Sequence, residues 1–124
     1  MKNENIVAID TNILFAISQH KIDVFNEIEK LVGKTTFAIT EAIDAELDKL
    51  SEKYKKEVNI ARELLKKKKI QIIRTEAKTA DASLVELAKQ GYTIATADRL
   101  LKKRIKGYGA RLIYLRQNKY LEAG

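Results

Sequence analysis

Residues 79–104 read TADASLVELAKQGYTIATADRLLKKR, and this stretch decides the fold class because it combines two helical patterns with one short strand. Apolar residues recur with the helical period between Asp81 and Gly91, and a glycine in that position is a typical helix terminator. Residues 92–95 predict the strand, and Asp98 is placed to cap the second helix. This order favours an α/β fold, in which the carboxyl ends of parallel strands meet at a ligand-binding crevice.

The rest of the chain continues the alternation of apolar strands and amphipathic helices. The run IVAI at residues 6–9 predicts a buried central strand, and TFAI at residues 36–39 predicts a second strand, with Thr40 as the cap of the next helix. The remaining expected elements are helices at residues 13–18, 22–32, 42–50 and 51–69, strands at 70–73 and 111–115, and a frayed tail at 118–124. The order favours a three-layer α/β/α sandwich with a mostly parallel sheet of about five strands.

Length and composition predict a single compact domain over residues 1–124. The sequence is 45% hydrophobic, with no Pro and only 5 Gly, so we expect no linker and no long disordered segment. No apolar run approaches the roughly 18 residues of a membrane span, and the N-terminal segment has no signal-peptide pattern, so we expect a cytoplasmic protein that does not bind membranes. Because Cys is absent, disulfides, zinc knuckles and thiol catalysis are excluded, and any bound metal must be held by oxygen.

Charge is distributed unevenly along the chain. Residues 1–50 contain 5 Lys and 9 acidic residues, a net charge of −4, whereas residues 51–124 contain 19 Lys or Arg and 8 acidic residues, a net charge of +11. Nucleic acid is the commonest partner of so basic a surface, but Lys-rich helices are often only solvated. Both interpretations stay open on charge alone.

Four carboxylates are placed where the expected elements converge. Asp10 follows the first strand, Asp81 lies in a first helical turn and Asp98 follows a later strand. Glu46 lies on the apolar face of its helix, where an unpaired carboxylate is costly, so we expect it to have a partner. Simpler roles are helix capping for the three aspartates and an ion pair with a buried Lys for Glu46.

Together these acids predict a metal site and a hydrolytic reaction. Carboxylates brought together cannot stay ionised without a cation, and an all-oxygen site suits Mg²⁺ or Mn²⁺. Such ions activate water for phosphodiester hydrolysis without a nucleophilic side chain or a histidine base. We therefore take Asp10, Glu46, Asp81 and Asp98 as candidate catalytic residues and metal ligands.

The order of these acids and their neighbours resembles the PIN-domain ribonucleases over essentially the whole chain. The matching residues are Asp10-Thr11-Asn12, Glu46-Leu47, Ala80-Asp81, Ala95-Thr96-Ala97-Asp98 with the basic residues after it, and residues 109–116, GARLIYLR. The last of these is closer to the archaeal and rRNA-processing branch than to the average toxin. The resemblance implies a PIN-like fold and an Mg²⁺- or Mn²⁺-dependent endoribonuclease that acts on single-stranded RNA.

Several residues next to the acids have candidate roles. The hydroxyls of Thr11 and Thr96 either hydrogen-bond the carboxylates or bond within their own turns, and both alternatives stay open. Asn12 orients Asp10 or a metal-bound water, with a role in the turn as the alternative. Four basic residues beyond Asp98 are candidates for contacts with RNA phosphates rather than solvated charges only, namely Arg99, Lys102, Lys103 and Arg104.

Two positions depart from the family pattern. Many relatives have a second acid after the one that Asp81 matches, which here is Ala82, and many have Asn where this chain has Ala97. The missing acid weakens the case for a second metal, and it keeps open an alternative, a catalytically weak RNA-binding or assembly subunit. The resemblance also implies a homodimer and either an antitoxin or a ribosome-assembly partner, without separating a toxin from an RNA-processing factor.

Overall fold

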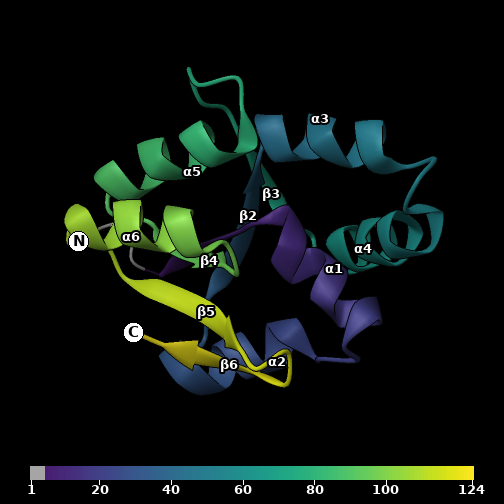
Figure 1. The fold of residues 1–124 in the computed structure, drawn as a ribbon, viewed down its shortest axis with the longest axis horizontal. Coiled ribbons are helices and arrows are strands. Elements are labelled where there is room, and N and C mark those ends of the chain that lie inside the picture. Colours follow the sequence, from purple (N-terminus) through teal and green to yellow (C-terminus); the bar gives the residue numbers. More distant parts are fainter. Residues whose placement is uncertain (1–4) are drawn as a thin grey trace.

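The computed structural model describes residues 5–124, and helices and strands alternate along it (Figure 1). The strands are β1 Ile6–Ile9, β2 Thr36–Thr40, β3 Gln71–Ile73, β4 Thr93–Thr96, β5 Leu112–Arg116 and β6 Tyr120–Ala123. The helices are α1 Thr11–Gln19, α2 Val24–Val32, α3 Glu41–Leu50, α4 Lys55–Lys67, α5 Ala80–Lys89 and α6 Arg99–Gly107. Residues 1–4, which belong to the segment expected to have no signal peptide, lie outside the described residues.

The strands form one sheet in the order β3-β2-β1-β4-β5-β6. The first five pair in parallel, and β6 pairs with β5 in the antiparallel direction. Figure 1 shows α5 and α6 on one side of the sheet and α1 and α4 on the other. The predicted α/β sandwich with a mostly parallel sheet is therefore confirmed, with a sixth strand added at one edge.

The pairing of β1 with β4 in the middle of the sheet positions the candidate site. Val7, Ala8 and Ile9 are fully buried, as a continuous apolar run in a central parallel strand requires. The chain leaves β1 toward β2 on one side and returns to β4 on the other, so the strand order reverses between these two strands. Ligands bind α/β sheets beyond the carboxyl ends at such a reversal. Within residues 5–124, no helix has both the length and the apolar character needed to cross a bilayer.

Both predicted helix caps are confirmed. The Thr40 hydroxyl accepts a hydrogen bond from the Ile43 amide at the start of α3, at 3.1 Å. The Asp98 carboxylate accepts from the amides of Leu100 and Leu101 at the start of α6, at 2.9 and 3.1 Å. Such caps satisfy amide groups that have no partner within the helix, so short-range sequence signals suffice to place them.

The helix expected over residues 51–69 is shorter than predicted. A turn at residues 51–54 separates α3 from α4, and Tyr54 stands just before α4 with φ −122° and ψ 50°. Apolar spacing continues through residues 51–54, which is why the pattern predicts a second helix that already begins at residue 51. The chain changes direction there, and the Tyr54 ring packs against Phe15 of α1, with the ring centroids 5.5 Å apart.

The frayed tail expected over residues 118–124 is wrong. Gln117 and Asn118 both adopt φ of 54°, the conformation of a tight hairpin turn, and the chain returns as β6. Leu121 is buried, and its amide donates a 2.8 Å hydrogen bond to the carboxylate of Glu27 in α2. This contact joins residues far apart in sequence and orders the segment. A local sequence pattern cannot predict such a contact.

Candidate active site at the ends of β1 and β4

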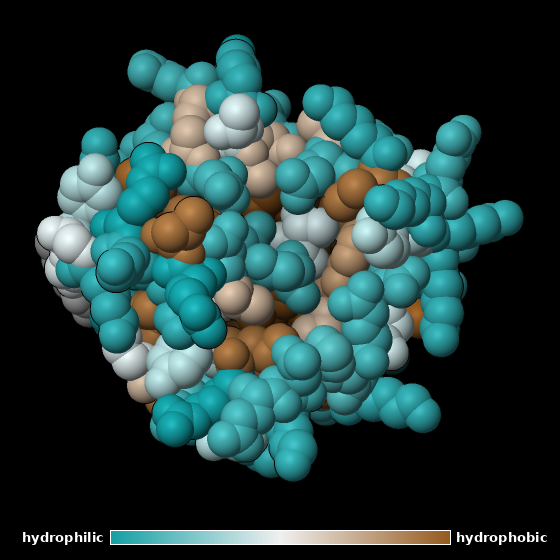
Figure 2. Space-filling view, viewed as in Figure 1, coloured by the Kyte–Doolittle hydropathy of each residue, from teal (hydrophilic) through white to brown (hydrophobic). Residues whose placement is uncertain are grey.

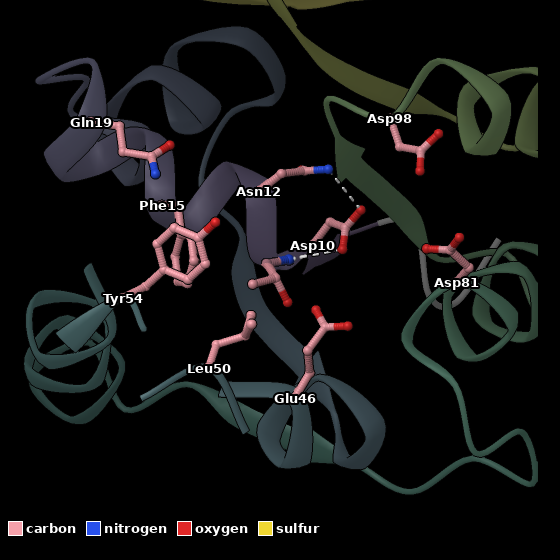
Figure 3. Close-up of a pocket in the computed structure, with 10 residues that line it drawn as sticks. Asp10, Asn12, Phe15, Gln19, Glu46, Leu50, Tyr54, Asp81 and Asp98 are labelled. Carbon is pink, nitrogen blue, oxygen red and sulfur yellow. Dashed lines mark hydrogen bonds between the residues drawn. The ribbon is translucent and has the colours of Figure 1, made fainter. Parts of the chain in front are cut away.

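A hollow of about 370 Å³ opens at the carboxyl ends of β1 and β4, and we call it the acidic hollow (Figure 3). All four predicted acids line it: Asp10, Glu46, Asp81 and Asp98. Asp10 lies between β1 and α1, whereas the other three belong to α3, α5 and the start of α6. The fold thus brings together carboxylates that are distant in sequence.

Asp10 is the most rigidly held of the four acids. It is only 4% exposed, and its carboxylate accepts a 2.6 Å hydrogen bond from the Thr96 hydroxyl and a 2.8 Å bond from the Thr11 amide. The side-chain amide of Asn12 donates a third, at 3.3 Å. Three donors from two sides of the sheet reversal therefore fix the orientation of this carboxylate before any ligand binds.

Asn12 and Thr96 each connect Asp10 to the turn after β4. The Asn12 side-chain oxygen accepts from the Ala97 amide at 3.0 Å, and the Thr96 hydroxyl accepts from the Asp98 amide at 3.1 Å. The Thr96 hydroxyl therefore both hydrogen-bonds a carboxylate and bonds within its own turn, the two roles that the sequence left open. The Thr11 hydroxyl takes neither, because this buried group has no hydrogen-bond partner among residues 5–124.

Burial raises the pKa of Asp10 from 3.8 to about 6. The hydrogen bonds from Thr96 and Thr11 lower the pKa, and the negative charges of Asp81 and Glu46 raise it. Desolvation and like charge both disfavour the ionised form, whereas donors to a carboxylate favour it. The raised value means that the environment of Asp10 does not fully compensate its charge.

Asp81, which lies on the same side of the acidic hollow as Asp98 in Figure 3, experiences the same kind of repulsion. Its pKa is raised, first by partial burial and then by the charges of Asp98 and Glu46, while Arg104 acts in the opposite direction. Capping does not explain this residue, because Thr79 caps α5 through a 3.3 Å bond from the Ala82 amide. Capping does explain part of what Asp10 and Asp98 do.

Among residues 5–124, the partner expected for Glu46 is not a Lys or Arg side chain. Within residues 5–124, none of the four acids of the hollow forms an ion pair with Lys or Arg. Glu46 is half-buried on α3, and Figure 3 shows its carboxylate directed toward Asp10. The ion pair considered as the simpler explanation of Glu46 is therefore absent from this part of the chain.

The donor set fits a hard divalent cation, although the side chains stand apart. Carboxylate oxygens dominate the polar lining, and the unpartnered Thr11 hydroxyl adds a neutral oxygen donor, which are the ligand types that Mg²⁺ and Mn²⁺ prefer. In the described part of the chain, no three acidic side chains lie close enough to share an ion as they stand. Side-chain rotation by the more exposed acids would have to close the site around a metal.

The basic residues beyond Asp98 divide into two kinds. Arg99, Lys103 and Arg104 are exposed on α6. Lys102 is half-buried, with its ammonium group 4.0 Å from the centroid of the Tyr114 ring. Its positive charge is thus held by an aromatic face, and three of the four predicted cations remain open to a ligand.

Residues 7–118 match the family described as a PIN like domain. The chain belongs to this family. The resemblance inferred from the sequence is confirmed.

Named relatives cover nearly all of this PIN domain. The chain is 34% identical over 114 residues to Ribonuclease VapC9 of Archaeoglobus fulgidus. The aligned region covers 90% of this chain and 83% of the relative. It is 32% identical over 122 residues to Ribonuclease VapC4 of Methanocaldococcus jannaschii, with coverage of 91% and 92%. It is 30% identical over 119 residues to the human rRNA-processing protein FCF1 homolog, spanning 92% of this chain but 59% of the relative.

A solved structure gives the same result in three dimensions. The structure of the PIN domain endonuclease Utp24 superposes with a TM-score of 0.80 and 30% sequence identity, covering 95% of this chain and 90% of that one. At this identity both the fold and the family relationship are supported.

Sequence reasoning missed the apolar side of the acidic hollow. Phe15, Tyr54 and Gln19 line it across from Asp81 and Asp98 in Figure 3, and Leu50 lines it next to Glu46. Leu50 and Tyr54 continue one helical stripe across residues 51–54, so their spacing signals packing only. The turn that follows Leu50 and directs Tyr54 into the hollow has no signal in the sequence.

Proposed function

We propose that this PIN domain is an Mg²⁺- or Mn²⁺-dependent endoribonuclease that hydrolyses phosphodiester bonds in single-stranded RNA. The observation that carries the proposal is the acidic hollow, where four carboxylates meet with no ion pair to Lys or Arg within residues 5–124. Uncompensated like charges favour binding of a cation. The ribonuclease and endonuclease names of the relatives support the same reaction class.

In this proposal Asp10, Glu46, Asp81 and Asp98 hold the metal. When bound, the ion activates a water molecule and neutralises charge on the phosphate and the leaving oxygen. Thr96 and Asn12 orient Asp10 through their hydrogen bonds, so its carboxylate needs little rearrangement on binding. The exposed cations of α6, namely Arg99, Lys103 and Arg104, bind phosphates on either side of the one that is cut.

Two observations favour a second candidate function, an RNA-binding or assembly subunit with weak catalysis. Ala82 stands where many relatives have a further acid, and among residues 5–124 no three acids share a metal-binding geometry as they stand. Relatives named as VapC ribonucleases and as rRNA-processing proteins support two kinds of partner, an antitoxin or a ribosome-assembly factor. A homodimer is also part of the proposal, and size-exclusion chromatography with light scattering tests it directly.

Cleavage of single-stranded RNA by the purified protein tests the main proposal. We expect cleavage with Mg²⁺ or Mn²⁺, and we expect a chelator to stop it. Replacing Asp10, Asp81 or Asp98 by Asn, or Glu46 by Gln, should each lower the cleavage rate by roughly two or more orders of magnitude. Each replacement substitutes a neutral amide of similar size for a charged metal ligand. The effects should not add, since the acids act as one unit.

A control variant and a binding measurement separate the two candidate functions. Asp44 lies on α3 like Glu46 but is paired with Arg62 outside the hollow, so Asp44→Asn should cleave within a few-fold of the parent. Mn²⁺ should raise the melting temperature of the parent by mass action and leave that of Asp10→Asn unchanged. If Asp10→Asn and Asp98→Asn both cleave RNA like the parent, the activity is a contaminant and the RNA-binding subunit is the better account.

A further inference from the structure

The acidic hollow has a second side that hydrolysis of a phosphodiester bond does not require. Phe15, Leu50 and Tyr54 form what we call the aromatic wall, with Phe15 and Tyr54 across the hollow from Asp81 and Asp98 and Leu50 next to Glu46 (Figure 3). A metal and a phosphate are both polar, and neither gains from an apolar surface. The wall therefore fits another part of a nucleotide.

Tyr54 combines an apolar face with an unused polar group. Its ring is half-buried and packs against the Phe15 ring with an angle of 47° between the two ring planes. Phe15 lies behind it and is only 7% exposed. The Tyr54 hydroxyl forms no hydrogen bond with residues 5–124, so it is open to solvent or to a ligand. A ring held from behind, with an open polar tip, is suited to contact a planar ligand that carries hydrogen-bonding groups.

A cation stands beside this ring. The ammonium group of Lys53 lies 5.4 Å from the centroid of the Tyr54 ring. Single-stranded nucleic-acid sites combine aromatic rings that contact bases with positive charges that follow the backbone. Tyr54 supplies an aromatic ring that lines the hollow, and Lys53, which does not line it, supplies a positive charge over that ring.

We propose that the aromatic wall binds the unpaired base of a nucleotide adjacent to the scissile phosphate. The proposal rests on the proposed function, because the acids define where that phosphate lies. A hollow of about 370 Å³ is within the usual size of a small-ligand pocket, and a base in a duplex has its faces covered by its neighbours. The wall thus makes the site selective for single-stranded RNA.

The position of the wall also distinguishes it from the ordinary core. Core residues of the sheet such as Ile9 and Ile94 have no exposed surface, whereas Leu50 and Tyr54 remain half-exposed at the edge of the hollow. Hydrophilic side chains cover most of this face of the molecule, with small apolar patches near its middle (Figure 2). An apolar surface beside four carboxylates would be covered by a bound base.

Abasic RNA tests the contact directly. In a single-stranded oligonucleotide with one cut position, an abasic nucleotide is placed in turn at each position beside the cut. With the parent protein, one such position should raise KM by roughly fivefold to a hundredfold, the range expected for one base on one aromatic ring. With Tyr54→Leu, which keeps an apolar contact to Phe15, KM should be raised for the intact RNA and should no longer respond to the abasic position.

Tyr120→Leu is the matched control. Tyr120 is an exposed tyrosine on the edge strand β6, outside the hollow, so this variant should discriminate against the abasic RNA like the parent. If Tyr54→Leu discriminates as strongly as the parent, the base is bound elsewhere and the inference is wrong. If neither parent nor variants cleave RNA with Mg²⁺ or Mn²⁺, the proposed function fails instead.

A binding measurement without metal keeps the two failures apart. The chain has no Trp, so Tyr54→Trp introduces a single fluorescent reporter on the wall. In chelator, single-stranded oligonucleotide should quench its fluorescence, and a blunt duplex of the same sequence should not. Equal quenching by both, or by neither, would overturn the inference, and thermal melting first establishes that the Tyr54→Trp protein is folded.

Discussion

Helix α3 carries two groups of acids whose charges are balanced in different ways. Asp44 and Asp48 face α4, where the Arg62 guanidinium bonds the Asp44 carboxylate and lies 2.7 Å from the carboxylate oxygen of Asp48. Glu46 lies between them in sequence but on another face of the helix, toward Asp10 and without an ion pair in residues 5–124. Within residues 5–124, the acids that join two helices are ion-paired, whereas the acids of the hollow form no ion pair.

The largest expected consequence is a pH dependence of stability that originates at Asp10. Its pKa is about 6 in the folded protein and 3.8 in the unfolded chain, so the folded state holds a proton that the unfolded state has released between these values. Stability therefore falls as pH rises from about 4 to about 6, by roughly 3 kcal/mol, and the loss is complete above pH 6. Urea unfolding in chelator, from pH 4 to 8, measures it.

The difference between the parent and Asp10→Asn isolates this effect from other titrating groups. The variant has no titrating group at position 10, so the parent should lose stability relative to it across this pH range. The amide adds a cost that does not vary with pH, because Thr96 donates to the carboxylate and would face a second donor. Parallel curves for the two proteins would show that Asp10 titrates normally and that the hollow carries no uncompensated charge.

The sequence was sufficient where the deciding contacts are local or periodic. Thr40 and Asp98 cap their helices through bonds to amides two or three residues away, which short-range patterns reveal. Asp10 could be placed at a strand end because its strand is a continuous apolar run. These features identify the family and place its acids at one edge of the sheet.

The sequence was insufficient where distant residues decide the outcome. The last strand depends on a bond from Leu121 to Glu27, and the direction of Tyr54 depends on its contact with Phe15. The sequence does not distinguish Lys102 from the basic residues around it, because its contact with the Tyr114 ring depends on the fold. The unpaired Thr11 hydroxyl likewise results from packing that no spacing predicts.

Charge removal on the two faces of α3 should change the free energy of unfolding in opposite directions, by less than the effect at Asp10. Arg62→Met keeps the apolar stem and removes the charge, so it should lower the free energy of unfolding by roughly 1 to 2 kcal/mol, because Asp44 and Asp48 lose their shared donor. Glu46→Gln removes a repelling charge and should leave stability equal or higher in chelator. Urea unfolding at pH 7 measures both. A loss of stability in Glu46→Gln as large as in Arg62→Met would mean that the two faces do not differ.

The smallest expected effect is on the salt dependence of RNA affinity. The basic side chains also divide into those that are ion-paired and those that are not. Arg62 is occupied by acids of α3, whereas Arg99, Lys103 and Arg104 on α6 form no ion pair within residues 5–124. If they bind phosphates, replacing all three by Ala should flatten the plot of log affinity against log salt by about 2, since each contact with single-stranded RNA contributes roughly 0.7. Fluorescence anisotropy in chelator, from low to moderate salt, measures the slope without cleavage.

Two matched variants decide whether position or charge alone matters. Replacing Lys66, Lys67 and Lys69 at the end of α4 removes the same charge from residues that do not line the hollow, and the slope should change little. Lys102→Ala should change it less than Lys103→Ala, because the Lys102 ammonium already lies on the Tyr114 ring. Equal changes in all of these variants would indicate binding by net charge, and the α6 cations would then have no special place beside the acidic hollow.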